Sequence, residues 1–343
     1  MHWDPKPELF TLPILGWPIL WYNILFMAGF IFGFPIFAGV LQRFFLQRPE
    51  FLERDVVGPL QHPRLSDKRG LSAVVKALNE WLFSDDAIET VVSSRFARSS
   101  MHPSLALRRL QLEALFEKGL SSLQRQARIL TDKVLLYMVV ATVLGARLGH
   151  FLFYELPSDY LRNPLEIFRI PMAGLSSHGA AIGIVIALCL YVHRQKNALR
   201  GATWLHILDF VVVPTALAGA LIRVGNFFNQ EILGTETNVP WAVVFGHPAD
   251  HSAPVPRHPV QLYEAAAYLV IFVVLWRLSF RAKYLVHQGK LFGLFLVTVF
   301  GFRLFAECFK LEQSQLGTFG LTMGQWLSIP AVLAGLFFCL RKK

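Results

Sequence analysis

The sequence predicts an all-α polytopic membrane protein with seven transmembrane helices. Its composition supports this class, because 54% of the 343 residues are hydrophobic and only 16% are charged, whereas soluble domains are roughly 45–50% apolar and about 25% charged. A formal net charge of +10 fits a membrane protein that separates apolar spans from basic loops. Nucleic-acid binding is the weaker interpretation of that charge, and no nucleic-acid partner is expected.

Seven apolar runs are long enough to cross a hydrocarbon core of roughly 30 Å, which needs about 20 helical residues. The first run is too long for a signal-peptide core and no small-residue cleavage site follows it, so we expect it to remain as a helix. The predicted spans cover approximately residues 19–41, 134–153, 175–192, 203–222, 260–280, 291–309 and 324–340.

The Lys and Arg positions predict the orientation, since cytoplasmic loops carry the excess of these residues. One alternating set of connections, at 43–133, 194–200, 277–290 and 341–343, holds 25 of the 33 basic residues. The N-terminus is therefore expected outside and the C-terminus inside. The chain then divides into an N-terminal segment with the first span (1–42), a cytoplasmic insertion (43–133) and a six-helix membrane core (134–343).

The insertion over residues 43–133 is the one segment with soluble character. Its apolar residues recur at helical spacing and predict two or three amphipathic helices. They are Leu71, Val74, Val75, Leu78 and Leu82, and more loosely Leu105, Leu112, Leu115, Leu120 and Leu123. Two roles stay open for this extended cytoplasmic helical insertion: an appendage on anionic lipid, or a regulatory or partner-binding element.

Polar and ionisable residues gather at the outer ends of the predicted spans. Such residues are costly in a membrane and are candidates for function. With the orientation above, they converge on the outer half of the bilayer. They are Arg147, His178, Arg223, Asn226, Asn229, Glu231, Arg257, His258, Gln261, Glu264, Arg303 and Glu307.

Structural roles compete with functional ones for some of these residues. Arg147 alone is typical of an interfacial anchor, and Arg303 and Glu307, four residues apart, can neutralise each other. His178 is followed by Gly179 and other small residues, which let a neighbouring helix or a substrate come close. The segment RVGNFFNQE (223–231) is harder to explain structurally, because five hydrogen-bonding side chains follow directly on an apolar span.

Several guanidinium groups at the outer face of a membrane suit a phosphate, which Arg binds bidentately. A phospholipid headgroup is the phosphate most available there. A nearby His can act as a general base. The sequence has no G-x-S-x-G serine and no H-E-x-x-H zinc motif, and its cysteines Cys189, Cys308 and Cys339 lack metal-ligand spacing. We therefore expect no metal and no cofactor, and a nucleophile supplied by a second substrate.

An ordered set of motifs resembles the prolipoprotein diacylglyceryl transferase family of the bacterial inner membrane. The motifs are WYNILFMAGF (21–30), GARLGHFLFYE (145–155), SSHGAAIG (176–183), RVGNFFNQEILG (223–234), PWAVVF (240–245), RHPVQLYE (257–264), FRLFAECFK (302–310) and MGQWLSIPAVLAG (323–335). The resemblance implies seven spans, a periplasmic N-terminus, a cytoplasmic C-terminus and a small periplasmic head, here at about 223–259. It leaves the insertion largely unaccounted for.

The resemblance also implies the reaction. The family transfers the sn-1,2-diacylglyceryl group of phosphatidylglycerol to the lipobox cysteine thiol in prolipoprotein signal peptides, forming a thioether and releasing sn-glycerol 1-phosphate. A membrane transporter and a catalytically silent phospholipid-binding homologue are the alternatives.

The site residues expected from the polar pattern and from the resemblance together fall into two groups. His178 is the expected base for the substrate thiol, and Arg223 and Arg257 are expected to stabilise the leaving phosphate. Arg223 is also expected to bind the lipid headgroup, together with Tyr22, Asn226, Asn229, Glu231, Gly234, Arg147 and Glu264. The sequence departs from the common family pattern at Ile222, Ala180 and Thr235, none of which is assigned to the chemistry.

Overall fold

The computed structural model describes residues 1–11, 13, 16–46, 103–154, 176–199, 201–311 and 321–341. These residues are mostly helical. The chain divides into two compact units, one of Met1–Val40 with Leu130–Lys343, and the other of Leu41–Ile129. The first unit holds all the candidate site residues named above. The predicted helix at Leu71–Leu82 lies outside the described residues.

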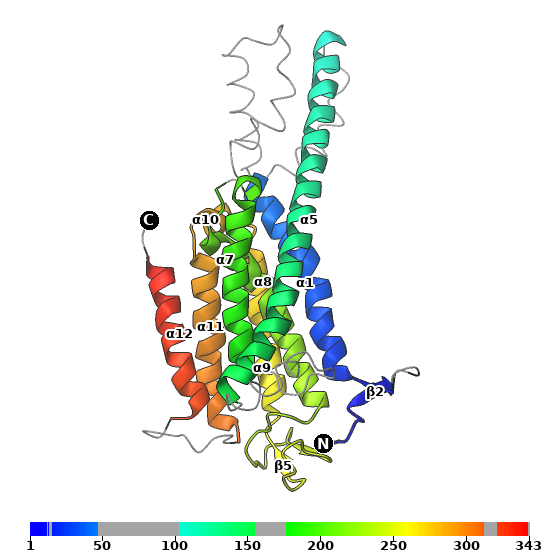
Figure 1. Ribbon diagram of the computed structural model, residues 1–343, viewed down its shortest axis with the longest axis vertical. Coiled ribbons are helices and arrows are strands. Elements are labelled where there is room, and N and C mark those ends of the chain that lie inside the picture. The colour runs from blue at the N-terminus through cyan, green and yellow to red at the C-terminus, as the bar shows by residue number, and fades with distance from the viewer. Residues whose placement is uncertain are drawn as a thin grey trace, which may run out of the picture. The chain divides into compact units, whose positions relative to one another are not determined.

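A helix occupies each of the seven predicted spans (Figure 1). Five of them are long and apolar enough to cross a membrane. The helices at the other two positions are α7 and α12, and the apolar part of α12, Gly324–Leu340, is shorter. The helices are α1 (Trp21–Leu46), α5 (Pro103–Tyr154), α7 (Ser177–Leu199), α8 (Trp204–Phe228), α9 (Val260–Leu278), α11 (Lys290–Ala306) and α12 (Met323–Leu340), with a short α10 (Ala282–Val286) and a 3-10 turn η6 (Glu307–Phe309).

Helix α5 begins well before the span predicted from residue 134. Its 52 residues include the Leu105–Leu123 pattern that was assigned to a separate amphipathic helix. No proline follows Pro103 within this stretch, so nothing in the sequence removes a backbone donor and breaks the helix. The apolar span is therefore the second half of one continuous helix.

Short strands correct the all-α assignment. β1 (His2–Trp3), β4 (Val243–Phe245) and β5 (Pro256–Arg257) form a three-stranded sheet in the order β1-β4-β5. β1 runs parallel to β4, and β5 is antiparallel to it. A separate hairpin pairs β2 (Glu8–Thr11) with β3 (Pro18–Leu20). Figure 1 shows β5 and the N-terminus at the end of the bundle where α8 finishes.

The sheet has its own small core. Phe227 at the end of α8 packs with Leu233, Val243 and Phe245, and Trp3 lies against them. The indole Nε1 of Trp3 also donates to the carbonyl of Phe227 over 3.1 Å. The sheet is thereby fixed to the last turn of α8, which carries the candidate site.

Small residues set the contact between α5 and α7. A Cβ atom added at Gly145 would lie 2.6 Å from the carbonyl oxygen of Gly179, and one added at Gly183 would lie 2.7 Å from that of Ala141. Real Cβ atoms do not approach that closely, so any side chain here would push the helices apart. The small residues after His178 thus serve a close helix contact, as the sequence indicated.

A buried carboxylate fixes the start of α11. Asp209 of α8 is fully buried, and its two oxygens accept from the backbone amides of Gly289, over 2.6 Å, and Phe292, over 2.7 Å. Amides at a helix N-terminus lack partners within the helix, and Asp209 supplies them from a neighbouring helix. This anchor sets the path of α11 toward Arg303, Glu307 and Lys310 at its other end.

Candidate active site

The turn after α8 gathers two asparagine side chains around one carboxylate. The amide nitrogen Nδ2 of Asn226 lies 2.9 Å from Oε2 of Glu231, and Nδ2 of Asn229 lies 3.0 Å from Oε1. The backbone closes the same turn, because the amide of Glu231 donates to the carbonyl of Asn226 over 2.9 Å. Glu231 is therefore held in place by two asparagines of its own motif.

The backbone of this turn is strained. Gln230 and Ile232 have φ angles of 53° and 57°, in the left-handed region that a β-branched residue such as Ile rarely adopts. Each residue held there costs about 1–3 kcal/mol, and such strain clusters at functional sites. The turn is thus maintained by its surroundings, including Gln261, whose Nε2 donates to the carbonyl of Glu231 over 2.6 Å.

Arg223 connects this turn to α9. Its Nη1 lies 3.4 Å from Oδ1 of Asn226, and its Nε lies 3.1 Å from Oε2 of Glu264. The contact with Glu264 is an ion pair without hydrogen-bond alignment, since Oε2 accepts no hydrogen bond from any residue that the structure describes. The side chain of Glu264 is fully buried, whereas that of Arg223 keeps 15% of its surface exposed. Arg223 is thus held on one side and open on the other.

Glu264 contacts a second cation that the sequence did not assign to the site. Nζ of Lys310 lies 3.1 Å from Oε1 of Glu264 and 2.9 Å from Oε1 of Glu307. The hydroxyl of Tyr268 donates to the same Glu264 oxygen over 3.4 Å. A buried carboxylate is stable only when it is paired and hydrogen-bonded, and Arg223 and Lys310 supply the opposite charges.

Arg257 lies on β5 and is almost completely buried. Its Nη1 donates to the carbonyl of Gly234 and its Nη2 to the hydroxyl of Ser252, each over 3.4 Å, and Nη2 lies 4.0 Å from the Glu236 carboxylate. Its Nε has no hydrogen-bond partner among the described residues. A buried donor without a partner is costly, so an acceptor brought to this group would relieve that cost.

Gly234 is required by packing. A Cβ atom there would overlap the carbonyl oxygen of His258 and lie 2.8 Å from Val260 Cγ2. The extended segment around Gly234 forms backbone hydrogen bonds with two other segments. The amide of Thr235 donates to the carbonyl of Phe309, and the amide of His258 donates to the carbonyl of Thr235. This segment links the end of α11 to the start of α9.

Tyr22 in the first turn of α1 packs on Gly225 of α8. A Cβ atom at Gly225 would lie 2.9 Å from Cδ2 of Tyr22, so glycine is what lets the phenol approach α8. A neighbouring pair supports the contact between α1 and α8, since the rings of Trp21 and Phe228 stack with their centres 5.2 Å apart. Tyr22 is thus adjacent to the Arg223 motif.

The contacts described above involve neither His178 nor Arg147. The backbone of His178 belongs to α7, but its side chain lies outside the described residues. The guanidinium carbon of Arg147 lies 4.5 Å from the ring centre of Phe151 on its own helix. The network itself comprises Arg223, Asn226, Asn229, Glu231, Glu264, Gln261, Tyr268, Lys310 and Glu307.

Lys310 and Tyr268 are the site residues that sequence reasoning missed. Lys310 had a usable signal, since it is one of the few basic residues in the connections that are predicted to face outside. Tyr268 lies inside an apolar span and had none. Within the described ranges, no three His, Cys, Asp or Glu side chains gather to hold a metal ion.

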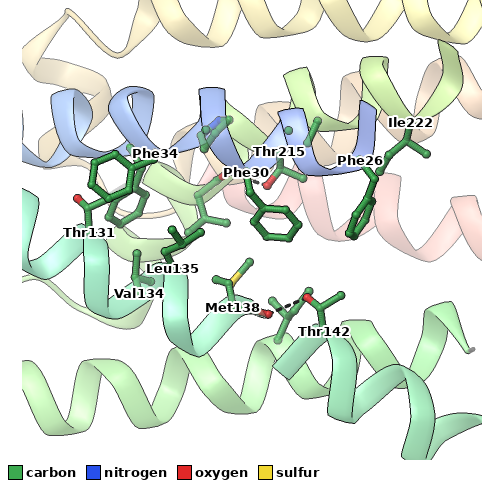
Figure 2. A pocket seen from close by; sticks show the side chains of 17 residues that line it. Phe26, Phe30, Phe34, Thr131, Val134, Leu135, Met138, Thr142, Thr215 and Ile222 are labelled. Atoms are coloured by element: carbon green, nitrogen blue, oxygen red, sulfur yellow. Dashed lines mark hydrogen bonds between the residues drawn. The ribbon is translucent and has the colours of Figure 1, made fainter. Parts of the chain in front are cut away.

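An apolar cavity of about 240 Å³ lies between the helices (Figure 2). Its walls come from α1, α5, α7 and α8, and the figure shows Phe26 and Ile222 together at one end. Ile222 directly precedes Arg223, and Phe26 is one helical turn from Tyr22. The hydroxyls of Thr142 and Thr215 bond to carbonyls of their own helices, so they add little polarity. The cavity suits a hydrocarbon chain, and one of its lining residues directly precedes Arg223.

Comparison with known proteins agrees with this arrangement. Residues 109–341 match the family model for prolipoprotein diacylglyceryl transferase. The chain is 35% identical to the phosphatidylglycerol–prolipoprotein diacylglyceryl transferase of Protochlamydia amoebophila, over 100% of this chain and 95% of the relative. It is 46% identical to the enzyme of that name from Tolumonas auensis, over 61% of this chain and 78% of the relative, and 42% identical to that from Chloroherpeton thalassium, over 58% and 71%.

The first of these matches spans the insertion, which the motif resemblance had left unexplained, while the other two cover about 60% of the chain. A multi-pass arrangement of apolar helices, the transferase signature motif and a match along the full length all agree. The chain belongs to the prolipoprotein diacylglyceryl transferase family.

Proposed function

We propose that this protein transfers the diacylglyceryl group of phosphatidylglycerol to the lipobox cysteine thiol of prolipoproteins. One observation carries the proposal: Arg223 is fixed by Glu264 and Asn226 yet partly exposed, and it directly follows Ile222, which lines the apolar cavity. A phospholipid has the matching form, with an anionic phosphate joined to hydrocarbon chains. The relatives compared above are all named as transferases, and none as a transporter.

The headgroup phosphate is held by guanidinium groups. Arg223 uses Nε and Nη1 for its contacts with Glu264 and Asn226, which leaves the Nη2 side for a ligand. Arg257 offers its unpartnered Nε. Arg is suited to this task because it stays charged and binds phosphate oxygens in pairs. Asn226, Asn229 and Glu231 keep the turn in shape and orient the headgroup hydroxyls.

The reaction is a displacement at the glyceryl carbon that bears the phosphate. The thiol sulfur forms a bond to this carbon, the carbon–oxygen bond breaks, and its electron pair leaves with the released sn-glycerol 1-phosphate. Charge grows on the leaving oxygen, where Arg223 and Arg257 stabilise it. His178 takes the thiol proton, since a thiol with an ordinary pKa of about 8.5 is mostly protonated at neutral pH.

The remaining assignments have different support. Tyr22 packs on Gly225 beside the Arg223 motif, which supports a place near the substrate. Gly234 acts by letting the His258 segment come close and by offering its carbonyl to Arg257. Arg147 stays a proposed substrate contact without direct support from its position.

The proposal places the protein in the bacterial inner membrane with seven spans, including α7 and α12. The N-terminus, the head at about 223–259 and the site face the periplasm, and the insertion at 43–133 and the C-terminus face the cytoplasm. The excess of Lys and Arg in one set of connections supports this orientation. Reporter fusions within residues 43–133 should be active only on the cytoplasmic side, and a periplasmic result would overturn the topology.

The deciding experiment uses the purified full-length protein in vesicles that contain phosphatidylglycerol. Addition of a lipobox peptide should give a thioether-linked peptide and an equal amount of glycerol phosphate, both detected by mass spectrometry. A peptide with Ser in place of the lipobox Cys is the control and should give neither product. Absence of product under conditions in which a family relative is active would reject the function.

A further inference from the structure

We propose that Lys310 is a positioning residue for the transfer reaction, because it neutralises Glu264 and so leaves Arg223 available to the lipid phosphate. The inference rests on the proposed function. It assigns to the site a residue that does not contact the reacting atoms and acts through two others.

Glu264 receives one cation on each oxygen. Arg223 lies 3.1 Å from Oε2 and Lys310 lies 3.1 Å from Oε1. The side chain of Glu264 is fully buried and that of Lys310 is only 8% exposed, so water screens neither interaction well. Because Glu264 is shared between two cations, it attracts Arg223 less strongly than it would if Arg223 were its only cation.

Lys310 is itself held rigidly. It follows the 3-10 turn at the end of α11, and its backbone forms a bridge with Gly234. Nζ also pairs with Glu307 at 2.9 Å, and the second oxygen of Glu307 accepts from the Thr322 hydroxyl over 3.1 Å. Gly324 leaves the space that the Glu307 carboxylate fills. Such support fixes the ammonium group relative to Glu264 without substrate.

The balance of charges explains why a second cation is needed. Glu264 and Glu307 are surrounded by Arg223, Lys310 and Arg303, the last with its Nε 3.6 Å from Glu307. Among these ion-paired side chains, three cations face two carboxylates, while Glu231 is bound by two asparagines and forms none of these ion pairs. Without Lys310 the group is neutral, and the buried Oε1 of Glu264 loses its cation.

The expected response to that loss is a movement of Arg223. A guanidinium can donate to both oxygens of a carboxylate, and an unpaired buried carboxylate is strongly unfavourable. Arg223 therefore turns toward Glu264 and presents fewer donors to the phosphate. Loss of Lys310 should therefore weaken the binding of phosphatidylglycerol more than it slows the reaction of the bound lipid.

The test measures kcat and KM for phosphatidylglycerol with the full-length protein in vesicles. Lys310→Met should raise KM about tenfold or more, which corresponds to the loss of one charge-assisted contact, with a smaller effect on kcat. Lys310→Arg, which keeps the charge, should restore KM to within about threefold of the original value. Lys283→Gln, at an exposed lysine of α10, is the matched control and should change neither constant.

A double-mutant cycle with Glu264→Gln separates positioning from a purely structural role. If Lys310 acts through the charge of Glu264, its replacement in the Glu264→Gln background should raise KM by less than about twofold. If the increases in KM caused by Lys310→Met and Glu264→Gln multiply in the double variant, the inference is rejected. An unchanged KM in Lys310→Met would also reject it. Should that variant not fold, Lys310→Gln gives the same reading, because KM does not depend on the amount of folded enzyme. Failure of the proposed function would be seen separately, because the enzyme without any substitution would then form no thioether.

Discussion

Nε of Arg223 on α8 lies 3.1 Å from the carboxylate of Glu264 on α9, so the arginine of the signature motif is oriented by a residue 41 positions away in the chain. The motif alone does not define the site. The turn at Glu231, the start of α9 and the end of α11 meet at this ion pair, and each of them changes how Arg223 is presented.

Replacement of Arg223 should abolish use of the lipid. Arg223→Lys keeps the charge but loses the planar donor pair, so we expect kcat/KM for phosphatidylglycerol to fall by about 10- to 100-fold, and Arg223→Ala should leave no measurable transfer. Circular dichroism of the purified variants should stay unchanged. A Lys variant with normal kcat/KM would show that bidentate binding of the phosphate is not needed.

His178→Ala should remove turnover and leave lipid binding intact. Loss of a general base lowers rates by about 10²- to 10⁴-fold, while the guanidinium groups that bind the phosphate are untouched. Single-turnover rates and binding of a fluorescent phosphatidylglycerol analogue measure the two effects. His193→Ala on the same helix, at an exposed position, is the control, and a normal rate for the His178 variant would reject its assignment as the base.

The apolar cavity should limit the acyl chain. Figure 2 shows Met138 of α5 among its lining residues, and Met138→Trp reduces the space available. We expect the variant to raise KM for dipalmitoyl phosphatidylglycerol more than for the dioctanoyl lipid, because the shorter chains need less of the cavity. Met138→Leu, which conserves volume, should behave as the original, and equal effects on both lipids would place the chains elsewhere.

Asp209 should contribute to stability and not to catalysis. Asp209→Ala leaves the buried amides of Gly289 and Phe292 without acceptors, at a cost of about 1–3 kcal/mol each. Thermal unfolding in detergent should therefore move to a clearly lower temperature. Thr298→Val, which removes only a bond to the carbonyls of its own helix, should stay within about 0.5 kcal/mol of the original. An Asp209 variant of unchanged stability would refute the anchoring role.

The contact between Asp4 and His247 should weaken in acid. Nδ1 of His247 lies 2.6 Å from Oδ1 of Asp4, and this hydrogen bond holds the pKa of Asp4 below its ordinary value of 3.8. Because the pKa of Asp4 is lower in the folded protein, the contact stabilises the fold at every pH above the ordinary pKa of the carboxyl group. This stabilisation is lost as the pH falls through the lowered pKa of the folded state. NMR titration of the Asp4 carboxylate should give a pKa below 3.8 that returns toward this value in His247→Ala, and identical titration curves would contradict the assignment.

The features that could be predicted from the sequence are those with a local pattern. Apolar runs locate the helices, and the spacing of Asn226, Asn229 and Glu231 on one turn locates the polar motif. The short strands could not be predicted, since β1 and β5 have two residues each and show no alternation. Lys310 could be noticed as a basic residue in a connection predicted to face outside, but its contact with Glu264 depends on how α9 and α11 pack.

Strand β1 also has a consequence for biosynthesis. The amino group of Met1 bonds to the carbonyl of Ala242 across 241 residues, and ribosomes add about 5–20 residues per second. The first strand must therefore wait roughly 10–50 s for its partner, until α1, α5, α7 and α8 have been made and the segment after α8 has emerged. Completion of the sheet that carries Arg257 is thus a late event, and the enzyme should gain activity only after most of the chain has been synthesised and inserted.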